Sequence, residues 1–153
     1  MVQWAAGERI TASKLSTTRI SAACDAGFTP GTSVADISGM TITFTTTRAN
    51  VVVHAIAVLD AEALTTTPST GTLVGELLVD GSAQSAQILW NAGVAAASND
   101  DARGPGVQSW LVTLASAGSH TLKMRGSRVG GTASHMRVNA IHSTLTLTVE
   151  DSV

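Results

Sequence analysis

Charged and aromatic residues are scarce in this sequence, tyrosine is absent and cysteine occurs once. Asp, Glu, Lys and Arg together make up 13% of the 153 residues, and aromatic residues make up 3%. The single cysteine, Cys24, cannot form a disulfide within the chain, so we expect it to be a small buried apolar side chain. A net charge of -2 gives none of the strongly basic surface that binds nucleic acid or an anionic membrane.

Long apolar runs and a secretory signal are also missing. No run of about 18 apolar residues exists, so we expect no membrane-spanning helix. The first residues lack the basic and then apolar order of a secretory signal, which predicts a protein made and kept in a cytoplasm unless it leaves as part of a particle. The low charge has two interpretations: other subunits cover much of the surface, or the host favours Ala, Thr and Gly.

Small and β-branched residues dominate the chain, and in several short stretches apolar and polar residues alternate. Near the end, Leu145, Leu147 and Val149 alternate with threonines, which is the period-2 pattern of a strand with one buried face. The stretches on either side of a turn at 116–119 alternate in the same way. About eight such strands predict an all-β fold, an antiparallel jelly-roll β-sandwich with a short N-terminal arm.

Three connections and one strand stand out within this predicted sandwich. Asp80-Gly81 is the strongest hairpin signal. Residues 91–106 predict the longest loop, and residues 126–134 a glycine-rich one. The run Val51–Leu59 is apolar on both faces apart from His54, which predicts a central strand covered on each side. The final run, 136–150, predicts a single strand.

Residues 1–20 differ from the rest and predict a docking arm, followed by the jelly roll over residues 21–153. Thr11 can cap one helical turn. Trp4, Ile10, Leu15 and Ile20 are large apolar side chains on a segment too short to fold alone. They must therefore pack on this domain or on a neighbouring protein.

No catalytic or metal-binding pattern occurs, so the sequence predicts a protein that is not an enzyme and holds no cofactor or metal. His54, His120, His135 and His142 have none of the spacings typical of metal sites. His54 and His142 fall inside predicted strands, where a hydrogen-bonded core or interface histidine is the usual role. His120 follows a turn, and we expect its ring to bond local backbone.

Two groups of side chains are candidates for subunit contacts. Trp90 and Trp110 lie in predicted strands and supply large apolar area, either to the core or to a neighbouring subunit. Arg125, Arg128 and Arg137 form a basic cluster around the glycine-rich loop. This cluster either solubilises the loop, which we favour, or contacts an acidic patch on a neighbouring chain.

Two parts of the sequence resemble known virion proteins. Residues 4–15, with an aromatic, Gly-Glu, an apolar-Thr-Ala run and then Leu, resemble the N-terminal segment of many structural proteins of tailed phages, especially those of actinobacterial hosts. Residues 39–44, 117–123 and 137–149 resemble the jelly-roll domains of such virions, which are similar in architecture to the heads of tumour-necrosis-factor-like proteins.

The resemblance implies a trimeric, non-enzymatic virion component that is assembled in the host cytoplasm and contacts other virion proteins through its N-terminal arm. No coiled-coil or β-helix shaft is present, which favours a capsid decoration protein. The absence of tyrosine departs from the cytokine-like heads, whose tyrosines often line the trimer axis. The alternatives are a minor tail protein or a receptor- or glycan-binding head that uses loops 91–106 and 126–134. A cupin-like enzyme has little support from the histidine spacing.

Overall fold

A computed structural model describes residues 17–63, 69–94, 102–130 and 136–149, and within them the regular structure is all β. The strands are β1 (Thr18–Ala23), β2 (Ala35–Thr46), β3 (Val51–Ala63), β4 (Ser69–Val79), β5 (Ser82–Val94), β6 (Ala102–Leu114), β7 (Gly118–Val129), β8 (Met136–Val138) and β9 (Thr144–Val149). Among these residues there is no helix that could cross a membrane.

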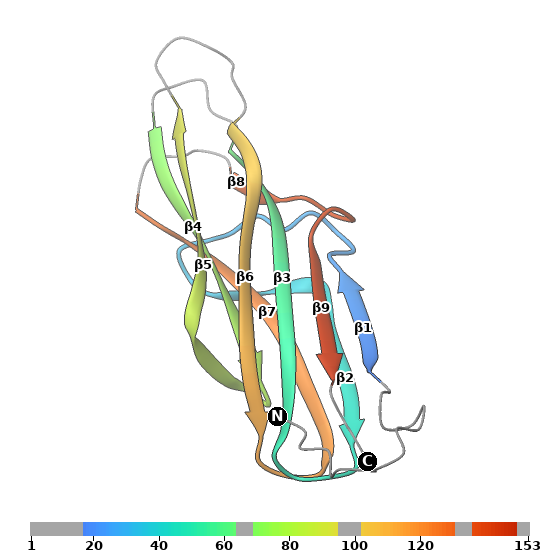
Figure 1. The fold of residues 1–153 in the computed structure, drawn as a ribbon. Helices are drawn as coiled ribbons and strands as arrows, with labels where there is room; N and C mark the ends of the chain where they lie inside the picture. The colour runs from blue at the N-terminus through green and yellow to red at the C-terminus, as the bar shows by residue number, and fades with distance from the viewer. Residues whose placement is uncertain (1–16, 64–68, 95–101, 131–135, 150–153) are drawn as a thin grey trace, which may run out of the picture.

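The strands form two antiparallel sheets packed as layers (Figure 1). One sheet has the order β1-β9-β3-β6, with β8 also paired to β3, and the other has the order β2-β7-β4-β5. Because β8 and β9 pair with successive parts of β3, they occupy one strand position, and the sandwich has eight positions. Every connection between these positions crosses between the sheets except the β4–β5 hairpin. This is the jelly-roll arrangement, so the predicted fold class is confirmed.

Alternation along each strand places the core between the two sheets. In β9, Leu145, Leu147 and Val149 are buried and the intervening threonines are half-buried, as their spacing predicts. In β3, the odd-numbered residues from Val51 to Ala61 face the core. Cys24 is fully buried, as expected, and this burial raises the pKa of its thiol.

The sandwich begins earlier than the predicted boundary at residue 21. β1 starts at Thr18 and pairs with β9 over its whole length, and Ile20 packs against the core. Ile20 therefore belongs to the jelly roll rather than to the docking arm, because its strand completes an edge of the sheet. Trp4, Ile10, Leu15 and the helical turn at Thr11 lie outside the described residues.

Two predicted loops are partly strand. β5 continues to Val94, β6 already begins at Ala102, and β7 continues to Val129. A Cβ at position 106 would lie 2.6 Å from Ile88 Cγ2, so Gly106 permits close packing rather than a turn. Pro105 has no N–H to donate to a neighbouring strand. β6 is an edge strand of its sheet, and proline is tolerated on an edge strand where its nitrogen faces away from the neighbouring strand.

The predicted final strand is interrupted between Val138 and Thr144. Within the interruption the Ile141 amide donates to the Cys24 carbonyl (2.8 Å), and the Cys24 amide donates to the Ser143 carbonyl (2.9 Å). The chain therefore leaves the ladder with β3 to bond the segment that follows β1. The expectation that His142 lies inside a strand is wrong, since this exposed residue falls in the interruption.

Candidate functional site

The outward side of the β1-β9-β3-β6 sheet is the most unusual surface of the described chain, and we call it the outer face. Its side chains alternate with those that enter the core. The outer face consists of Arg19, Ser21 and Ala23 of β1, Thr144, Thr146 and Thr148 of β9, Val52, His54, Ile56 and Val58 of β3, and Val107, Ser109, Leu111 and Thr113 of β6.

Four large apolar side chains of the outer face are exposed. Leu111 is 77% exposed, Val107 57%, Val52 45% and Ile56 36%. The expectation that Val51–Leu59 is covered on both sides is therefore wrong for the described chain, because only one side packs on the second sheet. A contiguous apolar patch of this kind is typical of an interaction surface.

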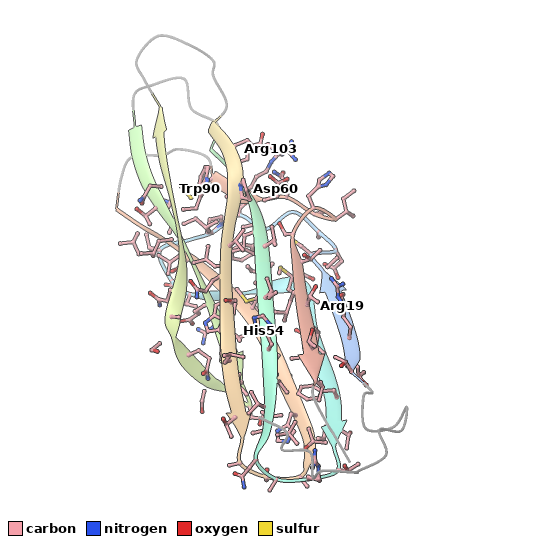
Figure 2. All side chains as sticks on the ribbon, in the orientation of Figure 1. Arg19, His54, Asp60, Trp90 and Arg103 are labelled. Carbon is pink, nitrogen blue, oxygen red and sulfur yellow. The ribbon has the colours of Figure 1, made fainter. Side chains whose placement is uncertain are left out.

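Ionisable groups are nearly absent from the outer face. Arg19 is the one permanently charged residue among those that define it, and it lies on the edge strand β1. Figure 2 shows His54 near the middle of the face, and its neighbours across the sheet are Thr148 on β9 and Leu111 on β6. The centre of the face is thus built from aliphatic side chains, threonines and one imidazole.

The outward side of the other sheet, which we call the charged face, is built differently. Lys123 Nζ lies 2.8 Å from Asp36 Oδ2, and Arg125 Nη1 lies 3.5 Å from Glu76 Oε1. The charged face therefore carries ion pairs in positions where the centre of the outer face carries aliphatic side chains. A host preference for uncharged residues would lower the charge of both faces, so it does not explain this difference.

Two ion pairs lie on the same sheet just beyond one end of the outer face, and Figure 2 labels the residues of the first, Asp60 and Arg103. Arg103 Nε donates to Asp60 Oδ1 at 3.1 Å, and this hydrogen bond holds the pKa of the Asp60 carboxyl below its usual value. Arg137 Nε donates to Glu62 Oε2 at 2.9 Å and lowers the pKa of that carboxyl in the same way. Glu62 is buried, so its charge needs this partner.

The three arginines predicted as possible subunit contacts bond within their own chain. Arg137 pairs with Glu62 and Arg125 with Glu76, while Arg128 Nη1 donates to the Gly130 carbonyl at 3.4 Å. No acidic patch on a neighbour is needed to explain their positions. Arg125 and Arg137 instead connect neighbouring strands of the sandwich, and Arg128 bonds the turn that follows its own strand.

Both tryptophans in strands point into the sandwich. Trp110 is buried, and its Nε1–H donates to the Ala86 carbonyl at 2.8 Å. Trp90 is partly buried and packs against the core. Of the two predicted roles, Trp110 therefore has the core role in this structure, because its strand register turns it inward. Trp90 lies beside the inward Gly104, whereas the Asp60–Arg103 pair lies on the opposite side of β6, so these groups do not form one surface.

The sequence did not predict one polar pair, which joins the start of β7 to the turn after β4. His120 is buried, with Nδ1 2.7 Å from Asp80 Oδ2 and Nε2 3.2 Å from the Ser116 carbonyl oxygen. The expected bond to local backbone is present, and Asp80 is an additional partner. Burial opposes ionisation of Asp80, but hydrogen bonds from His120 and the Thr121 amide outweigh it and lower the pKa. The pairing of β4 with β7 brings the two residues together.

Acid is expected to destabilise the protein through these carboxyl groups. The pKa values of Asp60, Glu62 and Asp80 are lowered by folding, so the unfolded chain binds more protons once the pH approaches the ordinary carboxyl range of about 4. Their contribution to stability is present above that range and is lost as the pH falls through the folded pKa values. Urea unfolding between pH 7 and pH 3 should show a declining midpoint, and a flat profile would contradict the ion-pair assignment.

Among the described residues, no three His, Cys, Asp or Glu side chains come together as a group that could hold a metal ion.

Comparison with known proteins identifies a fold but no family. No family model matches the chain, and no curated protein matches it. The infectious bursal disease virus VP2 subviral particle is similar in structure, with a TM-score of 0.51 and 9% identity over 89% of this chain and 33% of that one. Dimeric latent PorU from Porphyromonas gingivalis has a TM-score of 0.49 and 9% identity over 89% of this chain and 13% of that one.

A third similar structure is the CBM36-1 domain of a multidomain xylanase from the hindgut metagenome of Trinervitermes trinervoides. Its TM-score is 0.39, with 8% identity over 85% of this chain and 96% of that one. The chain spans about a third of the length of the viral protein and a smaller part of PorU. At these identities, the likeness to the viral capsid protein shows the β-sandwich fold alone.

Proposed function

We propose that this chain is a non-enzymatic structural protein of a virus particle, and specifically a homotrimeric capsid decoration protein of a tailed phage. The outer face carries the proposal: an apolar, almost uncharged sheet surface serves a protein whose role is lasting contact with other proteins. The jelly-roll fold fits this role, since capsid proteins commonly use it.

The charged side chains support a structural role. Asp60 and Glu62 are held ionised by arginines of their own chain, so neither is poised to donate a proton near neutral pH. Asp36 and Glu76 bond basic residues across strands of the charged face. The charges described here thus tie the sandwich together.

The proposed attachment to the particle is the arm that precedes β1. β1 is the edge strand of its sheet, so the chain enters the sandwich at a margin rather than through the core. Trp4, Ile10 and Leu15 are the large apolar side chains of that arm. Full burial of each in a docking site contributes about 1.5–3 kcal/mol, which is enough to attach a small domain.

Deletion of residues 1–16 is expected to remove the protein from particles while leaving it folded. The truncated chain should keep the melting temperature of the full chain, because β1 begins beyond the deletion. Purified particles, analysed by quantitative mass spectrometry, should contain the full chain in stoichiometric amount and the truncated chain only in traces. Trp4→Ala should reduce occupancy, whereas Gln3→Ala, its neighbour in the same segment, should not.

A second measurement, antibody labelling, shows where on the particle the protein lies. Labelling by antibody in electron microscopy should decorate the capsid shell, and labelling confined to the tail would identify a minor tail protein instead. Full occupancy by the truncated chain would show that the sandwich itself holds the protein on the particle. Absence of the full chain from particles would overturn the proposed function.

A further inference from the structure

We infer that the outer face is the contact between copies of this chain, so that the β1-β9-β3-β6 sheet of one subunit packs against a second copy. The inference rests on the proposed function in that it takes the particle protein to be oligomeric. It goes further by assigning the contact to one of the two sheets. The residues that carry it are Val52, Ile56, Val107 and Leu111.

The exposed side chains form one continuous strip. Ile56 pairs with Ser109, Val58 with Val107 and Val52 with Thr113, so the outward residues of β3 and β6 lie in adjacent columns. Thr144, Thr146 and Thr148 of β9 continue the strip towards β1 with shorter side chains. In Figure 2, the labelled His54 lies near the middle of this surface. A pleated surface of aliphatic and threonine side chains can pack closely on another sheet.

The size of the face suits an interface between subunits. β3 and β6 each have 13 residues, and β1 and β9 each have six. At about 3.3 Å per residue and about 4.8 Å between strands, the whole outward side of the sheet presents on the order of 600 Å², with the ion-paired end counted as a polar rim. Contact between two surfaces of this size buries on the order of 1,200 Å² in total, which is at the lower bound of specific, stable interfaces.

The composition of the face favours a second copy as the partner. Contacts between identical subunits are more apolar than transient contacts, and charge is depleted at their centre. Here the charges lie at the margins, with Arg19 on the β1 edge and the Asp60–Arg103 pair at one end. A strongly charged partner would find no complementary group at the centre. Homo-oligomers with closed symmetry are also the common form of assembly among soluble proteins.

The charged face provides a matched control. Leu89, on β5, is 63% exposed and lies on the outward side of the other sheet, so it has nearly the exposure of Leu111 without belonging to the outer face. Leu111→Arg and Leu89→Arg therefore make the same chemical change at similar exposure. The two variants differ in the sheet that they alter.

Light scattering at micromolar concentration tests the inference. The wild type and Leu89→Arg should both have a mass of at least two 15.6 kDa chains. Leu111→Arg should have the mass of one chain, or should assemble only at a concentration at least tenfold higher, because its charge would be buried without a partner. A monomeric wild type overturns the inference, and so does a Leu111→Arg oligomer as stable as that of Leu89→Arg.

Cysteine labelling tests the same contact if Leu111→Arg fails to fold. Ser109→Cys places a thiol on the outer face and Gln87→Cys places one on the charged face, while the native Cys24 is fully buried. In the folded oligomer, a maleimide should react with Cys at position 109 at least tenfold more slowly than with Cys at position 87. Dilution to monomers should remove the difference. Equal labelling rates in the oligomer would overturn the inference.

The two proposals can fail separately. A monomer that is nevertheless stoichiometric in particles would remove the self-contact and leave the virion role intact. An oligomer that forms through the outer face but is absent from particles would do the reverse.

Discussion

Replacement of Gly39 by alanine is expected to lower the free energy of unfolding by about 2–5 kcal/mol, as the sum of a left-handed backbone and a steric clash. Gly39 has φ +78, and a Cβ there would collide with the Ala23 carbonyl oxygen and lie 2.8 Å from the Asp25 amide nitrogen. Both obstacles are backbone atoms, which cannot rotate away. At this point β2 shifts its register against β7, between Asp36 and Thr41, and approaches the chain that leaves β1.

Gly81→Ala separates the two contributions. Gly81 has φ +82 in the hairpin turn after β4, and a Cβ there would meet nothing within 4 Å. With Asp80 at φ 49, it forms the turn that Asp-Gly predicts. We therefore expect a loss of about 1–2 kcal/mol for Gly81→Ala, from the backbone conformation alone. If urea unfolding gave the same loss of unfolding free energy for both variants, the close contact between position 39 and the Ala23 carbonyl would be contradicted.

Trp110→Ala is expected to cost about 3–5 kcal/mol, as large-to-small changes of buried aromatic residues do. Trp110 is 5% exposed, and its indole N–H bonds the Ala86 carbonyl, so the variant leaves both a cavity and an unpaired acceptor. For a chain of this size the melting temperature should fall by roughly 6–20 °C. Differential scanning calorimetry measures the change.

Two variants distinguish the core role of Trp110 from a role in assembly. Trp110→Phe keeps most of the apolar volume and loses the hydrogen bond, so it should be less destabilising than Trp110→Ala. Trp90→Ala should also cost less, because Trp90 is only partly buried. If Trp110→Ala kept the melting temperature and dissociated the oligomer, the indole would be a subunit contact after all.

The sequence was sufficient to predict the strands because burial on one face imposes a period of two. The buried residues Leu145, Leu147 and Val149 repeat with this period, and the order of strands and turns then favours a jelly roll. It was not sufficient to predict what covers each face. Val52 and Ile56 are as apolar as Val53, but only Val53 is buried by its own chain.

Features that depend on contacts between distant strands were mispredicted or missed. Gly104 and Gly106 are typical of turns, and their place in β6 depends on β5 side chains that pack where a Cβ would otherwise lie. His120 and Asp80 are adjacent only because β4 pairs with β7 in a particular register. The interruption after Val138 depends on hydrogen bonds to Cys24, far away in the chain. Local patterns contain none of this information.

The pairing of β1 with β9 determines when the β1-β9-β3-β6 sheet can close during synthesis. Within its sheet β1 bonds β9 alone, with Thr18 opposite Val149, so β1 has no sheet partner until nearly all of the described chain has been synthesised. β3 and β6 can pair earlier, but closure of the sheet between β1 and β3 must wait for β9, and such non-local pairings form slowly. A nascent or truncated chain that lacks β9 therefore leaves β1 unpaired, and the strand order makes closure of this sheet wait for synthesis of its last strand.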